Sequence, residues 1–230
     1  MELLRLHDRT GQTGERPNQS AQAWEGLRAD ILEGRLRPNA RLRLEELRSR
    51  YNVGISPLRE ALMRLQAEGL VVLQQNKGFR VLPATQEHLA DVCAVRTELE
   101  CLALRWSIER GDVAWEAGLL SALHKLSREA KMDGDGNLSR AWCYEHRCFH
   151  AALVSGGNSP VLESVRVVVF EQSERYVALS IGHMRQPRDD VDEHAALVEA
   201  SLARDVEKAC ALCRQHIMRT FEKASAALSS

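Results

Sequence analysis

The segment 44–83 restricts the possible folds of this chain more than any other part of it. One short apolar stripe at helical spacing ends at the tight turn Asn52–Gly54. A second begins at Ser56, which we expect to be the N-cap before Pro57. Two β-prone apolar runs follow, separated by the polar turn Asn76–Gly78. The order helix, turn, helix and two-stranded wing is typical of a winged helix-turn-helix, a module that reads DNA.

The sequence before and inside this segment supplies the expected core of the module. Apolar residues at helical spacing predict a further helix over 21–33. In the helix after Ser56, the predicted buried face consists of Leu58, Ala61, Leu62 and Leu65. We therefore expect a DNA-binding domain over 21–83, preceded by a polar, flexible arm over 1–20.

Exposed positions of this module predict how it would meet DNA. The N-terminal residues of a recognition helix face base edges, while residues around the helix hold phosphates. Arg59 lies one turn into that helix, where its guanidinium can pair with guanine or with a phosphate. Arg59 could instead form an ion pair within its own helix, but the complete helix-turn-helix and wing pattern favours DNA. The candidate DNA contacts are Arg43, Arg48, Ile55, Ser56, Arg59, Arg64, Lys77 and Gly78.

Charge is unevenly distributed along the chain, although the net charge is only −1. Residues 1–83 contain 14 Lys/Arg and 10 Asp/Glu, whereas residues 84–230 contain 17 and 22. The basic excess is concentrated between Arg35 and Arg80, with 10 basic and 4 acidic residues. The N-terminal part therefore suits a polyanionic partner, and the C-terminal part does not.

The remainder of the chain is predicted to be helical. Six helices joined by short loops are expected at 86–109, 112–131, 137–155, 159–182, 190–203 and 205–227. Asp205 is the expected N-cap of the last helix. The fold class is thus mainly α, with a winged helix-turn-helix followed by an all-α antiparallel six-helix bundle over 84–230.

Composition limits the other classes of protein. No apolar run is long enough to span a bilayer, and the N-terminus lacks the apolar core of a signal peptide. The six cysteines show no pair of CxxC motifs, so we expect reduced thiols in a cytoplasmic protein without a membrane partner. They are Cys93, Cys101, Cys143, Cys148, Cys210 and Cys213.

A group of histidines in the helical part is the second functional signal. His146 and His150 are four residues apart, so they share one face of a predicted helix. His194 and His216 lie in two later helices. Imidazoles that converge in a bundle core could hold zinc, nickel or a similar ion. Each of these histidines could alternatively be an ordinary hydrogen-bonded residue.

The N-terminal module resembles the GntR superfamily of bacterial transcription regulators. The resemblance depends on Ile31–Leu36, Arg41–Leu42, Glu45–Leu47, Ser56–Leu65, Glu68–Val71 and the wing residue Gly78. The family often has Arg where this chain has Ile55. The resemblance therefore implies that one common base contact is missing or is replaced by an apolar contact, for example to a thymine methyl group.

The helical part is similar to the FCD effector domain of the fatty-acid-regulator-like branch of this superfamily. The segments that match are Val95–Glu100, Phe149–Leu153, Gly157–Asn158, Glu193–Ala200 and Ala209–His216. In metal-binding members, an Asp and three histidines surround a divalent ion. His150, His194 and His216 match those histidines, and His146 replaces the Asp. Four nitrogen ligands would favour zinc, nickel or cobalt over manganese or magnesium.

The same resemblance implies a small carboxylate effector bound at the ion. Arg96 matches an Arg that can reach the cavity and pair with the carboxylate, although an ion pair with Glu100 is an equal alternative. We therefore expect a homodimeric, non-enzymatic regulator, with repression favoured, that binds double-stranded operator DNA. One alternative is a regulator whose ligand is the metal itself. A helical metallohydrolase with Glu145 as general base is the other.

Overall fold

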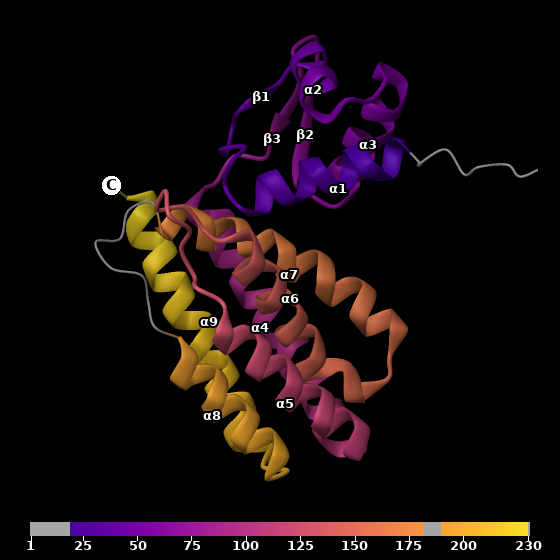
Figure 1. Cartoon of the computed structure of the whole chain (residues 1–230). Helices are drawn as coiled ribbons and strands as arrows, with labels where there is room; N and C mark the ends of the chain where they lie inside the picture. The colour runs from indigo at the N-terminus through magenta and orange to yellow at the C-terminus, as the bar shows by residue number, and fades with distance from the viewer. Residues whose placement is uncertain (1–18, 182–189, 230) are drawn as a thin grey trace, which may run out of the picture.

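The computed structural model describes residues 19–181 and 190–229, and these residues form two hydrophobic cores (Figure 1). The first core belongs to three helices and three short strands. They are α1 (Gln19–Leu32), β1 (Arg41–Leu42), α2 (Leu44–Tyr51), α3 (Ile55–Ala67), β2 (Val71–Gln74) and β3 (Gly78–Val81). The four residues predicted as the inner face of α3, Leu58, Ala61, Leu62 and Leu65, are each 0% exposed. This part is a winged helix-turn-helix, as the sequence predicted.

Two local expectations about this part were wrong. The wing sheet has three strands in the order β1-β3-β2, because Arg41 and Leu42 pair with Arg80 and Phe79. A two-residue strand is too short to show an alternating pattern in the sequence. Ser56 is not the N-cap of α3. That position belongs to Gly54, whose carbonyl accepts from the Leu58 amide at 3.1 Å.

Turns in this part follow the sequence signals. Asn52 adopts φ 52° after α2, Asn76 adopts φ 60° and Gly78 adopts φ 79° at the wing tip. Such positive φ values favour Gly and Asn over other residues. Helix α1 begins at Gln19, two residues before its expected start, and the rest of the expected arm lies outside the described residues.

The second core belongs to a bundle of six α-helices and one short 3₁₀ helix. Its elements are α4 (Gln86–Arg110), α5 (Val113–Arg128), α6 (Arg140–Val154), η1 (Ser155–Gly157), α7 (Pro160–Ile181), α8 (Val191–Leu202) and α9 (Val206–Leu228). Helix α4 packs against α6, α7 and α9. Asp205 accepts from the Lys208 amide at 3.0 Å and is the N-cap of α9, as predicted.

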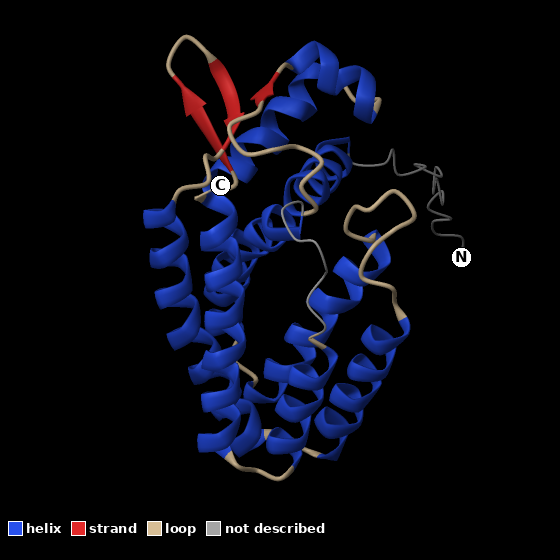
Figure 2. Cartoon of the chain, turned by 90° about the vertical axis from the view of Figure 1, so that its left-hand side faces the viewer, coloured by secondary structure: helices blue, strands red, loops and turns tan. Residues whose placement is uncertain are grey.

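The winged-helix part sits on one end of the bundle, as both overall views show (Figures 1 and 2). Helix α1 packs against α7, and Arg140 of α6 reaches Asp30 of α1 at 3.1 Å. In the part of the chain that the structure describes, no helix is both long enough and apolar enough to cross a bilayer. All six cysteines are free thiols, as expected.

Candidate metal centre and nucleic-acid interface

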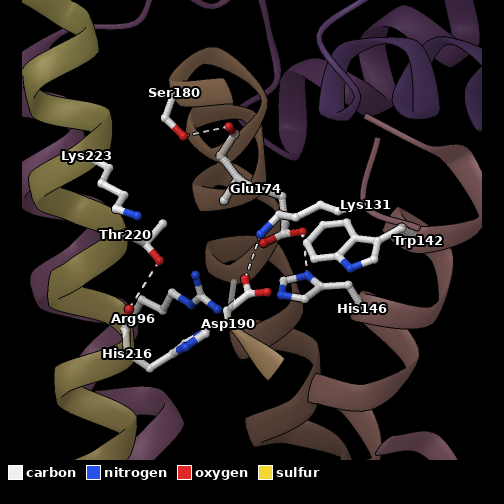
Figure 3. A pocket seen from close by; sticks show the side chains of 11 residues that line it. Arg96, Lys131, Trp142, His146, Glu174, Ser180, Asp190, His216, Thr220 and Lys223 are labelled. Carbon is white, nitrogen blue, oxygen red and sulfur yellow. Dashed lines mark hydrogen bonds and ion pairs between the residues drawn. The ribbon is translucent and has the colours of Figure 1, made fainter. Parts of the chain in front are cut away.

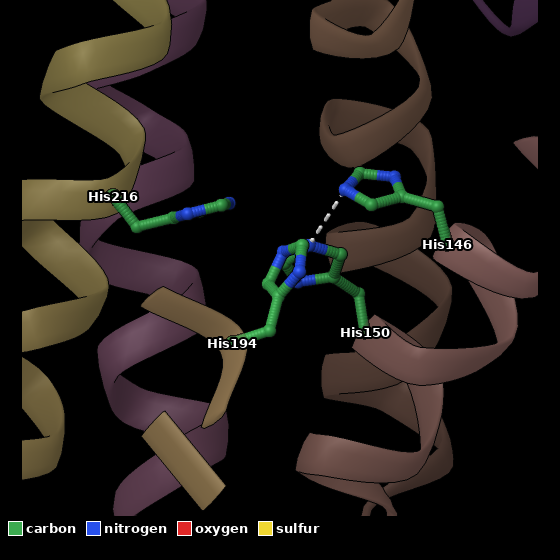
Figure 4. A group of neighbouring side chains, drawn as sticks. All are labelled: His146, His150, His194 and His216. Atoms are coloured by element: carbon green, nitrogen blue, oxygen red, sulfur yellow. Dashed lines mark hydrogen bonds between the residues drawn. The ribbon is translucent and has the colours of Figure 1, made fainter. Parts of the chain in front are cut away.

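Four buried histidines from three helices meet inside the bundle (Figure 4). His146 and His150 come from α6, His194 from α8 and His216 from α9. One ring nitrogen of each lies within 4.8 Å of the others. The Nε2 atoms of His146 and His150 are 3.2 Å apart. The fold therefore brings together all four histidines singled out from the sequence, although they lie on three separate helices.

Two acidic side chains hold two of these rings from behind. Glu174 of α7 accepts from Nδ1 of His146 at 3.1 Å. Glu193 of α8 accepts from Nδ1 of His216 at 2.9 Å and also from Arg219 at 2.8 Å. A carboxylate on Nδ1–H leaves the Nε2 lone pair free to face the cluster, which is the arrangement found behind metal-bound histidines.

Burial favours the neutral form of two rings of the cluster, His150 and His194. Burial, together with the charges of His146 and His216, lowers the pKa of His194 to about 2. Burial also lowers the pKa of His150 well below its usual value. For Glu174, burial raises the pKa, but the contacts with His146 outweigh this and leave it lowered. Neutral imidazoles are the form that binds metal ions.

These residues fit a divalent metal ion. Nε2 of His194 is buried and has no hydrogen-bond partner among the described residues. An unpaired buried nitrogen on one of four converging rings is costly unless something binds there. The two outer carboxylates supply the negative charge that four neutral ligands lack. His146, His150, His194 and His216 are the residues that could hold the ion.

A small cavity of about 30 Å³ adjoins the cluster (Figure 3). His146, His216 and Arg96 line it, so the sequence-predicted effector residue lies beside the candidate metal site. Arg96 donates to Ser173 Oγ at 2.6 Å. Its ion pair with Glu100 is long, at 3.9 Å, because Glu100 is held at 3.0 Å by Arg166. The ion pair with Glu100, expected as the alternative role of Arg96, is therefore only one of the contacts that Arg96 makes.

The same cavity is also lined by Lys131, Trp142 and Asp190, which sequence reasoning missed. Lys131 forms an ion pair with Asp190 at 2.7 Å and lies 4.4 Å from the centre of the Trp142 ring. The indole of Trp142 in turn stacks on His146. Asp190 directly precedes α8, the helix that carries His194. Trp142 and Asp190 each lie four residues before a histidine of the cluster, which is a signal the sequence offered, whereas Lys131 lies in neither α6 nor α8 and had no such signal.

Glu145, the general base required by the hydrolase alternative, does not belong to the group of converging ligands. That group comprises the four histidines alone among the described residues. The acids that do contact the cluster, Glu174 and Glu193, each accept a hydrogen bond from a ring. Glu193 directly precedes His194, which is a signal the sequence offered. Glu174 lies on a different helix and had no such signal.

The predicted DNA contacts are spread over the winged-helix part. Arg59 is exposed and has no ion pair within the described part of the chain, so the alternative of an intrahelical pair does not hold. Ser56 is exposed and Ile55 half-buried at the start of α3, while Lys77 and Gly78 are exposed at the wing tip.

The other three arginines among the predicted contacts have partners within the protein. Arg43 pairs with Glu46 at 2.9 Å and Arg48 with Glu45 at 3.4 Å, both at the surface. Arg64 pairs with Glu68 at 3.2 Å, and its guanidinium lies 3.5 Å from the centre of the Trp24 ring. Exposed ion pairs are weak and can exchange for phosphate, whereas Arg64 is held by two contacts.

A winged helix-turn-helix joined to a separate helical domain defines a class of DNA-binding transcription regulators. Residues 19–81 match the family described as bacterial regulatory proteins, gntR family, and residues 91–219 match the FCD domain. The chain therefore belongs to the GntR family and has a C-terminal FCD domain, which confirms both resemblances.

Individual relatives agree with this family. The protein named uncharacterized HTH-type transcriptional regulator BphR, from Paraburkholderia xenovorans strain LB400, is 41% identical over 196 residues, covering 84% of this chain and 80% of that protein. The HTH-type transcriptional repressor GlaR of Escherichia coli K12 is 34% identical over 203 residues, covering 86% and 92%. The solved structure of E. coli McbR/YncC shares the fold, with a TM-score of 0.71, 23% identity and coverage of 89% and 97%. The protein is thus a DNA-binding transcription regulator.

Proposed function

We propose that this protein is a repressor whose affinity for operator DNA is controlled by a small organic acid bound beside a divalent metal ion. The observation that carries the proposal is the convergence of four buried imidazoles within 4.8 Å, next to a cavity lined by Arg96. A bound ion would supply a Lewis-acidic position for a carboxylate oxygen. The Arg96 guanidinium is then placed to pair with the same carboxylate.

The donor set favours zinc or nickel. All four candidate ligands are imidazole nitrogens, which suit zinc, nickel and copper better than manganese or magnesium. The negative charge that a directly bound carboxylate would supply comes instead from Glu174 and Glu193, one step further out. These acids keep the site close to neutral when a divalent ion is present.

Repression and dimer formation are supported by separate observations. Two relatives are named as repressors: GlaR of E. coli, and the probable D-xylose utilization operon transcriptional repressor of Paenarthrobacter nicotinovorans. Helix-turn-helix dimers bind two half-sites, which fixes operator symmetry. Helices α4 and α7 pack together and expose apolar side chains suited to a contact with a second copy: Val95, Leu102, Val161 and Val165.

A second candidate function is regulation by the metal ion alone. The size of the cavity favours it, because about 30 Å³ holds one or two waters and not an organic acid. Under the first proposal, the cavity must widen to admit the effector. The names of the relatives favour either regulatory function over a hydrolase.

Binding measurements on purified protein test the proposal. We expect the protein to bind close to one zinc or nickel ion per chain, measured by elemental analysis. We also expect it to bind the DNA flanking its own gene, with an affinity that a panel of mono- and dicarboxylic acids changes only in the metal-loaded form. A response to metal that no acid changes further would support the second function. An absence of bound metal after loading would contradict both.

A matched double variant identifies the ligands. His150→Ala with His194→Ala should remove the bound metal while circular dichroism shows a folded protein. Glu145→Gln is the control, since Glu145 is adjacent to His146 but outside the group of ligands. It should retain full metal content. Full metal content in the double variant would refute the ligand set.

The DNA interface is tested through α3. Arg59→Ala should weaken operator binding by about 1–3 kcal/mol at fixed salt, because the exposed guanidinium would lose a base or phosphate contact. Fluorescence anisotropy with a labelled operator measures the change. The control is Arg105→Ala, which removes an exposed arginine from α4 of the bundle. Equal operator affinity in wild type and Arg59→Ala would remove Arg59 from the interface.

A further inference from the structure

One turn of α7 contacts both the DNA-binding part and the histidine site. On the DNA-binding side, Glu171 accepts from Nε of Arg28 in α1 at 2.9 Å, and Gln172 donates to the carbonyl of Glu68 at the end of α3 at 3.0 Å. Arg175, four residues after Glu171, donates to the carbonyl of Pro83 between the two parts at 2.6 Å.

The same turn reaches the site through the two residues in between. Ser173 accepts from Arg96 at 2.6 Å, and Glu174 accepts from His146 at 3.1 Å. Arg96 lines the cavity, and His146 is one of the four converging rings. Five consecutive residues of α7 thus contact, in order, α1, the end of α3, α4, α6 and the connecting segment.

This turn has little freedom to adjust one set of contacts without the other. Glu171, Ser173, Glu174 and Arg175 are all at most 5% exposed, so their rotamers are fixed by packing. Consecutive residues of a helix are held about 100° apart around its axis. A rotation or shift of α7 that changes the Glu174–His146 contact therefore also changes the contacts made by Glu171 and Gln172.

The DNA-binding part also packs directly against this turn of α7, at Gly69. Gly69, just after α3, adopts φ +72°, and a Cβ atom there would overlap the side-chain amide of Gln172. The end of the recognition helix is therefore in direct steric contact with α7. Through Glu68 and Gly69, a shift of α7 acts on the helix that carries Arg59.

We propose that the turn Glu171–Arg175 transmits the state of the histidine site to the DNA-binding part, with Glu174 as the positioning residue for His146. This inference rests on the proposed function, because it requires that the histidines hold an ion. Coordination through Nε2 fixes the His146 ring, and Glu174 passes that constraint to α7. The ion then favours one arrangement of α7 against α1 and α3, and operator DNA favours one arrangement as well.

The test is a double variant on the DNA-binding side of the turn, Glu171→Gln with Gln172→Ala. Operator Kd is measured with metal-free and zinc-loaded protein by anisotropy, and zinc Kd is measured by competition with a chelator. In wild type we expect the two operator Kd values to differ by about 5-fold or more. In the double variant the ratio of the metal-free to the zinc-loaded operator Kd should fall toward 1, while zinc Kd without DNA stays within about 2-fold of wild type.

Two further variants separate transmission from a general loss of structure. Arg28→Gln removes the same ion pair from the α1 side and should reduce the ratio as well. Glu163→Gln is the matched control on α7, because Glu163 pairs with Arg166 of the same helix. Among the residues that the structure describes, it is not a partner of the winged-helix part or of a histidine. It should keep the wild-type ratio.

Glu174 is tested by its effect on the ion. Glu174→Gln should weaken zinc binding by about 10–100-fold and alter the absorption spectrum of the cobalt-substituted protein, and Glu174→Asp should restore part of both. Wild type that binds zinc and operator without mutual influence would overturn the inference and leave the metal site intact. An unchanged ratio in Glu171→Gln/Gln172→Ala would overturn it too. Wild type that binds no ion would overturn the proposed function and the inference together.

Discussion

At the scale of single residues, His146 shows how one exchange changes the chemistry of a site. The family resemblance implies an Asp at this position. In this structure the nearest carboxylate is instead that of Glu174, which accepts a hydrogen bond from the His146 ring. In the proposed site, a nitrogen ligand would contact the ion, and the carboxylate lies one step away. Nitrogen ligands and oxygen ligands select different metals, so this residue should decide selectivity.

The variant His146→Asp tests that role. Replacing the ring nitrogen with a carboxylate oxygen should lower the ratio of nickel affinity to manganese affinity by about tenfold or more. Competition titrations with a metallochromic indicator measure both affinities. His88→Asp, a change of the same kind outside the cluster, should leave the ratio unaltered. An unaltered ratio in His146→Asp would show that His146 does not touch the ion.

At the scale of elements, Asp30 of α1 is the centre of a buried group of polar contacts. This buried carboxylate accepts from Arg35 at 2.7 Å, from the Tyr51 hydroxyl at 2.7 Å and from Arg140 at 3.1 Å. Burial raises the pKa of Asp30, but the hydrogen bonds from Arg35 and Tyr51 leave it lowered. Asp30 therefore connects α1 to the following loop, to α2 and to α6 of the bundle.

Asp30→Asn should lower the free energy of unfolding by about 2 kcal/mol, since an uncharged amide presents two donors where three partners need an acceptor. Urea denaturation followed by circular dichroism measures the loss. Glu60→Gln, an exposed change on α3, should have no measurable effect. A loss below about 0.5 kcal/mol would mean that Asp30 contributes no more than a surface ion pair.

Sequence patterns predicted the elements well where a periodic apolar face decided the structure. Leu58, Ala61 and Leu62 were expected to be buried, and they are. Two predictions failed for different reasons. Strand β1 exists because Arg41 and Leu42 meet β3, a tertiary contact that the local sequence does not contain. Helix α3 starts at Ile55 because the Gly54 carbonyl accepts from the Leu58 amide, a local backbone bond that takes the N-cap position from the Ser56 side chain.

At the scale of the whole molecule, the histidine site has a cost in stability. Burial lowers the pKa of His194 to about 2 and that of His150 well below its usual value. In the unfolded chain, both rings would titrate near 6.5. Below about pH 6.5 the unfolded state of the metal-free protein therefore binds more protons than the folded state, and stability falls as the pH falls.

Metal-free protein should lose about 1.4 kcal/mol of stability per pH unit for each of these two histidines, from about pH 6.5 downward. Urea unfolding at pH 7, 6 and 5 gives the slope. His194→Asn should reduce the slope by the share of one proton. Stability that stays flat between pH 6.5 and 5 would show that both rings are protonated in the folded state.

The sequence by itself determined the two-part fold, the candidate DNA contacts and the grouping of the four histidines. These follow from local periodicity, turn residues and spacing, which act over a few residues of chain. Only the tertiary structure decided that Glu174 and Glu193 hold two of the rings and that Arg96 lines the same cavity. It also decided that one turn of α7 contacts both parts. Such contacts depend on how helices distant in the chain pack, and packing geometry leaves no periodic signal in the sequence.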